Sequence, residues 1–327
     1  METLRIALAQ INPTVGDLKG NSEKIIEYIE KARANNADIV MFPELAVTGY
    51  PPEDLLLDKN FLKDTMSHLN DIIAHTTDIV AIVGFADSMD KKLYNAAGIV
   101  ANGKLINTYR KINLTRSSVF DDSKYFERGS NYPLYNLDGI EFYPVFLNDL
   151  KHLDNTGILK SDASPSIILC MDASCYYTGK PVETERAVSN IASRNKKYIA
   201  HLNMTGGQDE WVFEGGGFVA DTTGKIIAKS PVFEEDLLVV DMLFASGERR
   251  AESGERRAAG LSSLGGGFSL RERKGQGSEI SSQNRIILRT LNSELFRAPL
   301  FPRGKWYLCW NPLKRSTGHL SWEQGIT

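Results

Sequence analysis

The chain has 327 residues, of which 42% are hydrophobic and 24% charged, the balance of a soluble globular protein with enough residues for a sizeable core. No apolar run approaches the roughly 18 residues that a membrane-spanning helix needs, and Met1-Glu-Thr-Leu does not begin a signal peptide. The three cysteines are too few for a disulfide framework. We therefore expect a cytoplasmic protein with no membrane partner.

The first third of the chain alternates strands and helices. Apolar runs predict buried strands, and apolar residues at helical spacing predict amphipathic helices. The expected strands are 4–10, 39–42 and 78–85, and the expected helices are 21–35 and 60–74. Residues 93–100 and 104–111 flank the turn Ala101-Asn-Gly, which predicts a β-hairpin.

Further strands are expected along the middle of the chain. They are 140–147, 167–171, 198–202, 211–220, 226–230 and 237–241. Pro181 at a first helical position predicts a helix over 181–195. Alternating strands and helices, followed by hairpins, indicate an α/β protein with a mixed sheet sandwiched by helices.

The segment from Met41 to Leu57 places an acid at a strand end. The apolar run from Asp38 to Phe42 is broken by Pro43, so Glu44 would lie where a buried strand opens into a loop. Apolar neighbours would raise the pKa of its carboxyl group, as a general base that works near neutral pH requires. An isolated Phe-Pro-Glu would more often be a solvated loop acid.

The wider pattern around Glu44 is more specific. Phe42-Pro-Glu-Leu, followed by Thr48-Gly-Tyr-Pro-Pro-Glu-Asp-Leu, resembles the first catalytic segment of the nitrilase superfamily, and more narrowly the glutaminase domain of glutamine-dependent NAD synthetases. The resemblance covers about residues 3–243 and implies an α-β-β-α sandwich formed by a domain over 1–245. It also implies hydrolysis of glutamine, in which a cysteine thiolate attacks, a glutamate moves the proton and a lysine stabilises the oxyanion.

Two of these three catalytic groups are present. Glu44 matches the glutamate, and Lys111 in Tyr109-Arg-Lys-Ile-Asn-Leu matches the lysine. The run Val119-Phe-Asp-Asp-Ser-Lys-Tyr-Phe behind it resembles the family's lysine segment, with Asp122 in place of a second glutamate. A lone lysine is usually a surface cation, but this run favours the catalytic interpretation.

The nucleophile is missing from its expected position. The family pattern places it at a strand end, as Cys-Glu-Asp. Aligned on Gly139-Ile-Glu-Phe before it and Asp149 after it, that position is Leu147. A leucine has no lone pair and no titratable proton, so it cannot form a thioester.

Cys170 and Cys175 are the alternative nucleophiles. Leu169-Cys-Met-Asp superficially resembles Cys-Glu-Asp, but the run that begins at Ser166 resembles the following family strand and its Ala-Ser-Pro-Tyr-like turn. On this register Cys170 fills a buried strand position and Cys175 stands where a proline is usual. Both are interpreted as core-type thiols, and Cys175 is the backup candidate because it would lie at a turn facing the pocket.

The substrate-binding positions that the resemblance implies are Ser174, Ser117 and Asn148. Ser174 matches the family's substrate-contacting serine. Ser117 replaces an aromatic residue that would border the glutamine site, and Asn148 replaces the glutamate beside the nucleophile. His201 is interpreted as a core or supporting residue, because no other candidate ligand has metal-site spacing to it. No metal or cofactor is expected in this chain.

Residues 246–327 differ in character from those before them. They contain 14 Lys and Arg against 7 Asp and Glu, although the whole chain has a net charge of −3. Ser246-Gly-Glu-Arg-Arg-Ala-Glu is nearly repeated from Ser253, and a Gly/Ser-rich stretch follows. We expect a disordered, basic tail that does not bind nucleic acid. It lacks the Ser-Gly-Gly-x-Asp-Ser loop of the synthetase domain, to which ATP and Mg would belong.

Three hypotheses about function stay open. The first is a glutamine amidohydrolase that supplies ammonia for NAD synthesis, with its activity impaired by Leu147. The second is a non-catalytic pseudo-amidase that acts as a binding or scaffold protein, and the third is a truncated, frame-altered product. By analogy, the nitrilase-like domain also implies a homo-oligomer.

Overall fold

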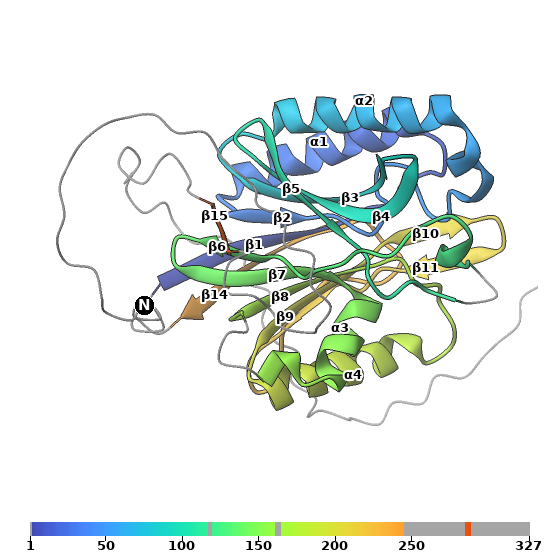
Figure 1. The fold of residues 1–327 in the computed structure, drawn as a ribbon. Helices are drawn as coiled ribbons and strands as arrows, with labels where there is room; N and C mark the ends of the chain where they lie inside the picture. Colours follow the sequence, from blue (N-terminus) through green and yellow to red (C-terminus); the bar gives the residue numbers. More distant parts are fainter. Residues whose placement is uncertain (1, 117–119, 161–164, 245–284, 289–327) are drawn as a thin grey trace, which may run out of the picture.

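The computed structural model describes residues 2–116, 120–160, 165–244 and 285–288. Two large β-sheets lie face to face at its centre, and a pair of helices covers the outer face of each (Figure 1). The α-β-β-α sandwich that the resemblance implied is thus confirmed. No helix in these ranges is long and apolar enough to cross a lipid bilayer.

Within these ranges, the first sheet has six strands in the order β14-β1-β2-β3-β4-β5. The strands are β1 (Glu2–Gln10), β2 (Ile39–Met41), β3 (Val80–Met89), β4 (Lys92–Ala101), β5 (Lys104–Arg110) and β14 (Asp236–Phe244). β1, β2 and β3 run parallel, because helices connect them. β4 and β5 continue the sheet as antiparallel hairpins, and β14 pairs antiparallel with β1.

The second sheet, counted over the same ranges, has seven strands in the order β13-β12-β9-β8-β7-β6-β15. The strands are β6 (Leu134–Leu137), β7 (Ile140–Phe146), β8 (Ile167–Asp172), β9 (Tyr198–Asn203), β12 (Phe218–Ala220), β13 (Ile226–Lys229) and β15 (Arg285–Leu288). Its parallel centre is β7, β8 and β9. A separate hairpin is formed by β10 (Thr205–Gln208) and β11 (Trp211–Glu214).

Helices α1 (Leu18–Ala34) and α2 (Lys59–His75) cover the first sheet, and α3 (Leu147–Asn155) and α4 (Lys180–Asn195) cover the second (Figure 1). The side chains of Asp17 and Asp58 cap α1 and α2 by accepting from backbone N–H groups of the first turn. Pro181 lies in the first turn of α4, as its position in the sequence predicted.

Strand alternation sorts the apolar side chains into three layers. In β1, Ile6 faces the space between the sheets and Ala7 faces α1 and α2. In β8, Leu169 faces between the sheets, whereas Cys170 faces the layer beneath α3 and α4. A side chain can therefore reach the space between the sheets only from the strand positions that face it, which are every second residue.

The strand expected over 211–220 is interrupted. β11 ends at Glu214 and β12 begins at Phe218, and between them Gly215 and Gly216 adopt φ values of 66° and 68°. These positive angles are accessible mainly to glycine and turn the chain out of one sheet before it joins another. The glycine run was a visible signal for this break.

The strand expected to end at Leu147 ends at Phe146, and residues 147–155 form α3, which the sequence analysis did not predict. Leu150 and Leu153, spaced as on one helix face, are its buried apolar residues. The expected tail lies mostly outside the described residues. Within it, residues 285–288 form β15, which pairs parallel with β6 in a region where little regular structure was expected.

Gly84 in β3 lets the loop that carries Glu44 approach the first sheet. A Cβ atom at this position would lie 2.2 Å from Pro43 O and 2.6 Å from Leu45 N. Val47 N donates to Gly84 O at 3.1 Å, so the loop rests directly on the strand. Glycine is required at position 84 because the backbone of the loop that carries Glu44 lies too close to the strand to leave room for any side chain.

We expect Gly84→Ala to lower the free energy of unfolding by about 1–3 kcal/mol, because the crowded atoms belong to backbone and cannot move aside as a flexible side chain can. Denaturant titration measures the change. Gly207→Ala is the matched control, since a Cβ atom there meets nothing nearer than Trp211 O at 3.6 Å. Equal stabilities for the two variants would contradict this account of Gly84.

Candidate active site

Strand ends deliver the residues that the sequence analysis selected. Glu44 follows β2, and Lys111 directly follows β5. Asn148 lies in the first turn of α3, immediately after β7, and Ser174 follows β8. The contacts of these side chains show which of them meet.

Lys111 lies between two carboxylates. Its Nζ is 2.7 Å from Glu44 Oε1 and 2.8 Å from Asp122 Oδ2. The three side chains are no more than 5% exposed, so water is largely excluded from the cluster. Glu44 and Lys111, which the sequence selected as catalytic positions, are thus brought into direct contact, and Asp122 joins them.

Burial and neighbouring charges together set the proton affinities of this cluster. Removal from water raises the pKa of Glu44 to about 7, against the attraction of Lys111, and the negative charge of Asp122 adds to the rise. Burial alone would lower the pKa of Lys111, but the charges of Glu44 and Asp122 outweigh it and raise that pKa above its usual range. Near neutral pH the lysine of the cluster is therefore cationic, and the glutamate can take up or release a proton.

Asn95 in β4 orients Glu44. Its Nδ2 donates to Glu44 Oε1 at 2.6 Å, and its backbone oxygen accepts from Lys111 N at 2.8 Å. The side chain is fully buried, and its Oδ1 has no hydrogen-bond partner among the residues that the structure describes. Asn95 was not among the residues predicted from the sequence. The signal was an amide side chain at the start of the buried apolar run of β4.

Thr115 connects the lysine to the start of α3. Lys111 Nζ donates to Thr115 Oγ1 at 3.1 Å, and Asn148 Nδ2 donates to the same oxygen at 2.9 Å. Thr115 N also donates to Asp122 Oδ2 at 2.7 Å. Asn148, expected as a substrate-binding position, is therefore part of the hydrogen-bond network around the lysine.

Leu147 begins α3 between two residues that reach this network. The ring of Phe146 is centred 5.5 Å from Lys111 Nζ, and Asn148 bonds to Thr115 as described. The backbone of Leu147 therefore lies at the border of the charged cluster. Its side chain is partly buried and packs with the apolar layer beneath α3. The nucleophile position of the family pattern implies that residue 147 faces Glu44 and Lys111, and this stays a prediction.

Asp149 holds the start of α3 against the lysine segment. It is fully buried and accepts from Ile112 N at 3.2 Å, from Asn113 N at 2.7 Å and from the hydroxyl group of Tyr109. These bonds join the strand-to-helix junction to the loop after Lys111. From the sequence, Asp149 served only as a point of alignment, and this role was not predicted.

Neither of the two described cysteines is suited to attack. Cys170 packs beneath α3 and α4, and burial raises its pKa well above the usual range. Cys175 is half-buried at the turn after β8, and burial raises its pKa to about 11. Both groups are therefore protonated thiols near neutral pH, whereas the thiolate is the nucleophile.

Apolar side chains form one border of the site, which we call the apolar wall. Its buried members are Leu45, Tyr50, Leu56, Ala86, Phe120, Phe126, Ala173, Met204 and Phe213. Tyr50 packs edge-on against Phe120 and Phe213, with ring centroids 5.3 and 5.9 Å apart. Cys175 and Trp211 pack against the wall from outside. Ser117, expected as a substrate-binding position, precedes Phe120 in the chain but lies outside the described residues.

Ser174 belongs to a second buried network next to the first. Its Oγ donates to Asp172 Oδ2 at 2.6 Å, and His201 Nε2 lies 3.3 Å from the same oxygen. The backbone oxygen of Asp172 accepts from Glu44 N at 3.4 Å. Burial would raise the pKa of Asp172, but the bonds from His201 and Ser174 and the charge of Lys180 lower it to about 2.

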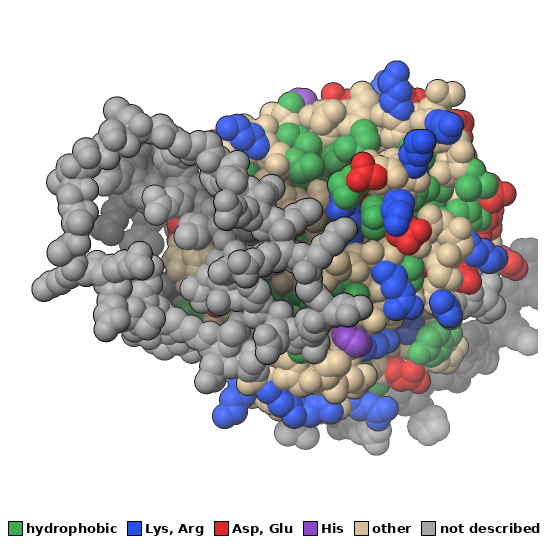
Figure 2. All heavy atoms as spheres, in the orientation of Figure 1, with side chains coloured by type: hydrophobic (Ala, Val, Ile, Leu, Met, Phe, Trp, Pro, Cys, Tyr) green, Lys and Arg blue, Asp and Glu red, His purple; other side chains and the backbone are tan. Residues whose placement is uncertain are grey.

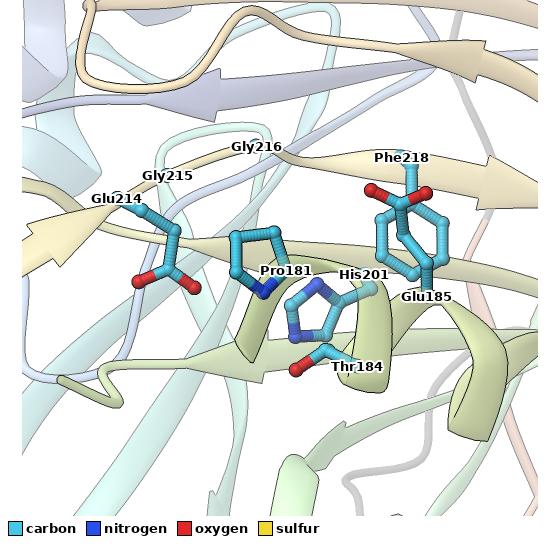
Figure 3. Close-up of a pocket in the computed structure, with 8 residues that line it drawn as sticks. All are labelled: Pro181, Thr184, Glu185, His201, Glu214, Gly215, Gly216 and Phe218. Carbon is cyan, nitrogen blue, oxygen red and sulfur yellow. The ribbon is translucent and has the colours of Figure 1, made fainter. Parts of the chain in front are cut away.

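A small pocket lies beside His201 (Figure 3). It is lined by Pro181, Thr184, Glu185, His201, Glu214, Gly215, Gly216 and Phe218. Lys180 and Glu214 form a buried ion pair at 2.7 Å, so the negative charge of Glu214 is already balanced by the lysine. The described part of the chain contains no group of three or more His, Cys, Asp or Glu side chains arranged to hold a metal ion. His201 therefore supports Asp172 and is part of no such group.

Comparison with known proteins identifies similar sequences. The family model described as Carbon-nitrogen hydrolase matches residues 5–250. The glutamine-dependent NAD(+) synthetase of Thermotoga maritima is 37% identical over 245 residues, which are 74% of this chain and 42% of that protein. The chain thus spans less than half the length of this curated relative.

Solved structures agree with these sequence matches. A glutamine-dependent NAD+ synthetase from Acinetobacter baumannii, in complex with ADP, has a TM-score of 0.70 and 32% identity, covering 73% of this chain and 45% of that one. An amidase from Nesterenkonia sp. has a TM-score of 0.64 and 20% identity, covering 73% of this chain and 90% of that one. The likeness to the amidase shows a shared fold.

The raised pKa of Glu44 gives a pH-dependent stability. Between about pH 4.5 and 7 the folded protein retains a proton at Glu44 that the unfolded chain has released, so the free energy of unfolding falls as the pH rises. We expect Glu44→Gln, which cannot ionise, to remove this fall. Relative to the variant, the wild-type protein should lose up to about 3 kcal/mol across that window.

Denaturant titrations at several pH values measure this difference. Glu23→Gln is the control, because the Glu23 side chain is 67% exposed. The control curve should follow the wild-type curve throughout. If the Glu44→Gln curve also ran parallel to the wild-type curve, the burial of Glu44 would not govern its proton affinity.

Proposed function

The chain belongs to the carbon–nitrogen hydrolase family, and on that premise we propose that residues 1–245 form a glutamine amidohydrolase domain with impaired activity. One observation carries the proposal: an assembled Glu44–Lys111–Asp122 cluster borders a strand-to-helix junction that holds Leu147. The relatives named as glutamine-dependent NAD(+) synthetases support glutamine as the substrate.

The proposed reaction needs a nucleophile in its first step. A thiolate attacks the side-chain amide carbon of glutamine, and the carbonyl oxygen becomes an oxyanion. The base that took the thiol proton gives it to the departing nitrogen, so ammonia leaves and a thioester remains. Water then attacks the thioester, and glutamate and the free thiol are released.

The charged cluster suits the proton and charge steps of this reaction. With a pKa of about 7, Glu44 can accept and return a proton near neutral pH. The cationic Lys111 can stabilise the oxyanion, most effectively where water is excluded. Asp122 and Asn95 hold these two groups in place through the contacts described above.

The thiolate step has no group to perform it at residue 147. Cys175 is a poor replacement, because its pKa of about 11 leaves almost no thiolate near pH 7. The remaining route is direct attack by water with Glu44 as the base. That route omits the thioester, so we infer slow hydrolysis.

The alternative function is amide binding without turnover. It is favoured by an assembled buried cluster next to a strand-to-helix junction whose residue 147 cannot attack. The two functions differ in one measurable respect. A binding protein would be saturated by glutamine and release no ammonia, whereas an impaired hydrolase would release ammonia slowly.

We expect the wild-type protein to release ammonia from glutamine at least about a thousandfold more slowly than a competent homologue, because the nucleophile, base and oxyanion groups act as a unit. Leu147→Cys alone should restore little activity. Leu147→Cys combined with Ser117→Tyr and Asn148→Glu should restore more than the sum of the single changes. An ammonia-release assay measures the rates, and intact-mass detection of an adduct with an electrophilic glutamine analogue measures the restored thiol.

Cys175→Ser is the decisive control in this series. In the wild-type background it should leave the slow rate unchanged, because Cys175 is not the nucleophile. Fast hydrolysis by the wild-type protein that disappears in Cys175→Ser would overturn the proposal and make Cys175 a relocated nucleophile. Circular dichroism of each variant establishes that it is folded.

A further inference from the structure

Exposed apolar side chains gather beside β11, and we call them the aromatic patch. They are Tyr176, Tyr177, Val212, Val232 and Phe233, with exposed fractions between 36% and 54%. The rings of Tyr176 and Phe233 pack edge to face, 5.2 Å between centroids, and Tyr176 N donates to Val212 O at 2.7 Å. Single exposed apolar residues are ordinary, but a contiguous group marks an interaction surface.

Acidic side chains form a rim around the aromatic patch. Asp209 and Glu210 precede β11, and Glu234 follows Phe233; all three are exposed and form no ion pair with any residue that the structure describes. Glu183 lies at another border and accepts from the Tyr177 hydroxyl group at 2.7 Å. Acidic and hydrophobic side chains also occur together along the edge of the molecule where Figure 1 places β10 and β11 (Figure 2).

We propose that the aromatic patch is the docking surface for residues 289–327 of the same chain. This segment contains six Lys and Arg against two Asp and Glu, so its charge is opposite to that of the rim. It also contains the aromatic residues Trp306, Tyr307, Trp310 and Trp322. Cations of the segment can pair with the rim carboxylates and lie over the exposed rings, while its aromatic side chains cover apolar area.

The segment is long enough to reach the patch. It begins after β15, and 39 residues extend from Arg289 to Thr327. At about 3.3 Å per residue an extended chain of this length spans more than about 100 Å. A folded domain of this size has a radius of gyration of about 18 Å, so the segment can reach any part of its surface.

A second copy of the chain fits the patch less well. In a symmetric pair the same surface would face itself, so the interface would carry the acids Asp209, Glu210 and Glu234 of both copies and no basic side chain of the rim. Like charges placed opposite one another oppose association. The basic segment removes this repulsion, because it brings positive charge to the rim.

Carbodiimide cross-linking of the full chain tests the proposal, because the reagent joins carboxylates to lysines that are in direct contact. We expect peptide mass spectrometry to identify Lys305 or Lys314 joined to Asp209, Glu210 or Glu234. A mixture of unlabelled and ¹⁵N-labelled chains distinguishes links within one copy from links between copies. Links within one copy support the proposal. Links only between copies, or none to the rim, overturn it.

Two variants make the test specific. Tyr176→Ser with Phe233→Ser removes exposed rings, and we expect the rim links to be lost. Arg303→Glu with Arg315→Glu leaves the patch intact but reverses charges in the segment, and it should lose the same links. Leu57→Ser is the control, since Leu57 is 68% exposed and lies outside the patch. Rim links that persist in both double variants would overturn the proposal.

Discussion

An ammonium group buried between two carboxylates is the interaction on which the candidate site depends. Removing an ion from water costs several kcal/mol even after the protein relaxes, so a buried lysine needs close compensation. Lys111 obtains it from Glu44 at 2.7 Å and Asp122 at 2.8 Å. Because these acids come from segments far apart in the sequence, the charge requirement ties the loop after β2 to the chain after β5.

The sandwich supplies the geometry that this charge cluster needs. Gly84 lets the loop after β2 lie directly on β3, and Asn95 on the neighbouring strand donates to Glu44. Strand parity then decides which side chains can approach the centre. Cys170 is one residue from Leu169 but faces the opposite layer, beneath α3 and α4.

The structure around residue 147 does not depend on which side chain occupies that position. The start of α3 is held by Asp149, which accepts from the segment after Lys111, and by Asn148, which donates to Thr115. None of these bonds needs a side chain at Leu147. A leucine can therefore occupy the junction while the neighbouring charged groups keep their contacts.

The sequence by itself determined α1, α2, α4 and most strands of the two sheets, because their apolar periodicity is local, and it located Glu44 through the break at Pro43. The family pattern added Lys111 and identified the leucine at 147. Only the tertiary structure decided that Asn95 orients Glu44, 51 residues away, and that Asp149 bonds to a segment 36 or 37 residues before it. Such contacts leave no local pattern, because which buried polar groups pair depends on how distant strands are placed beside one another.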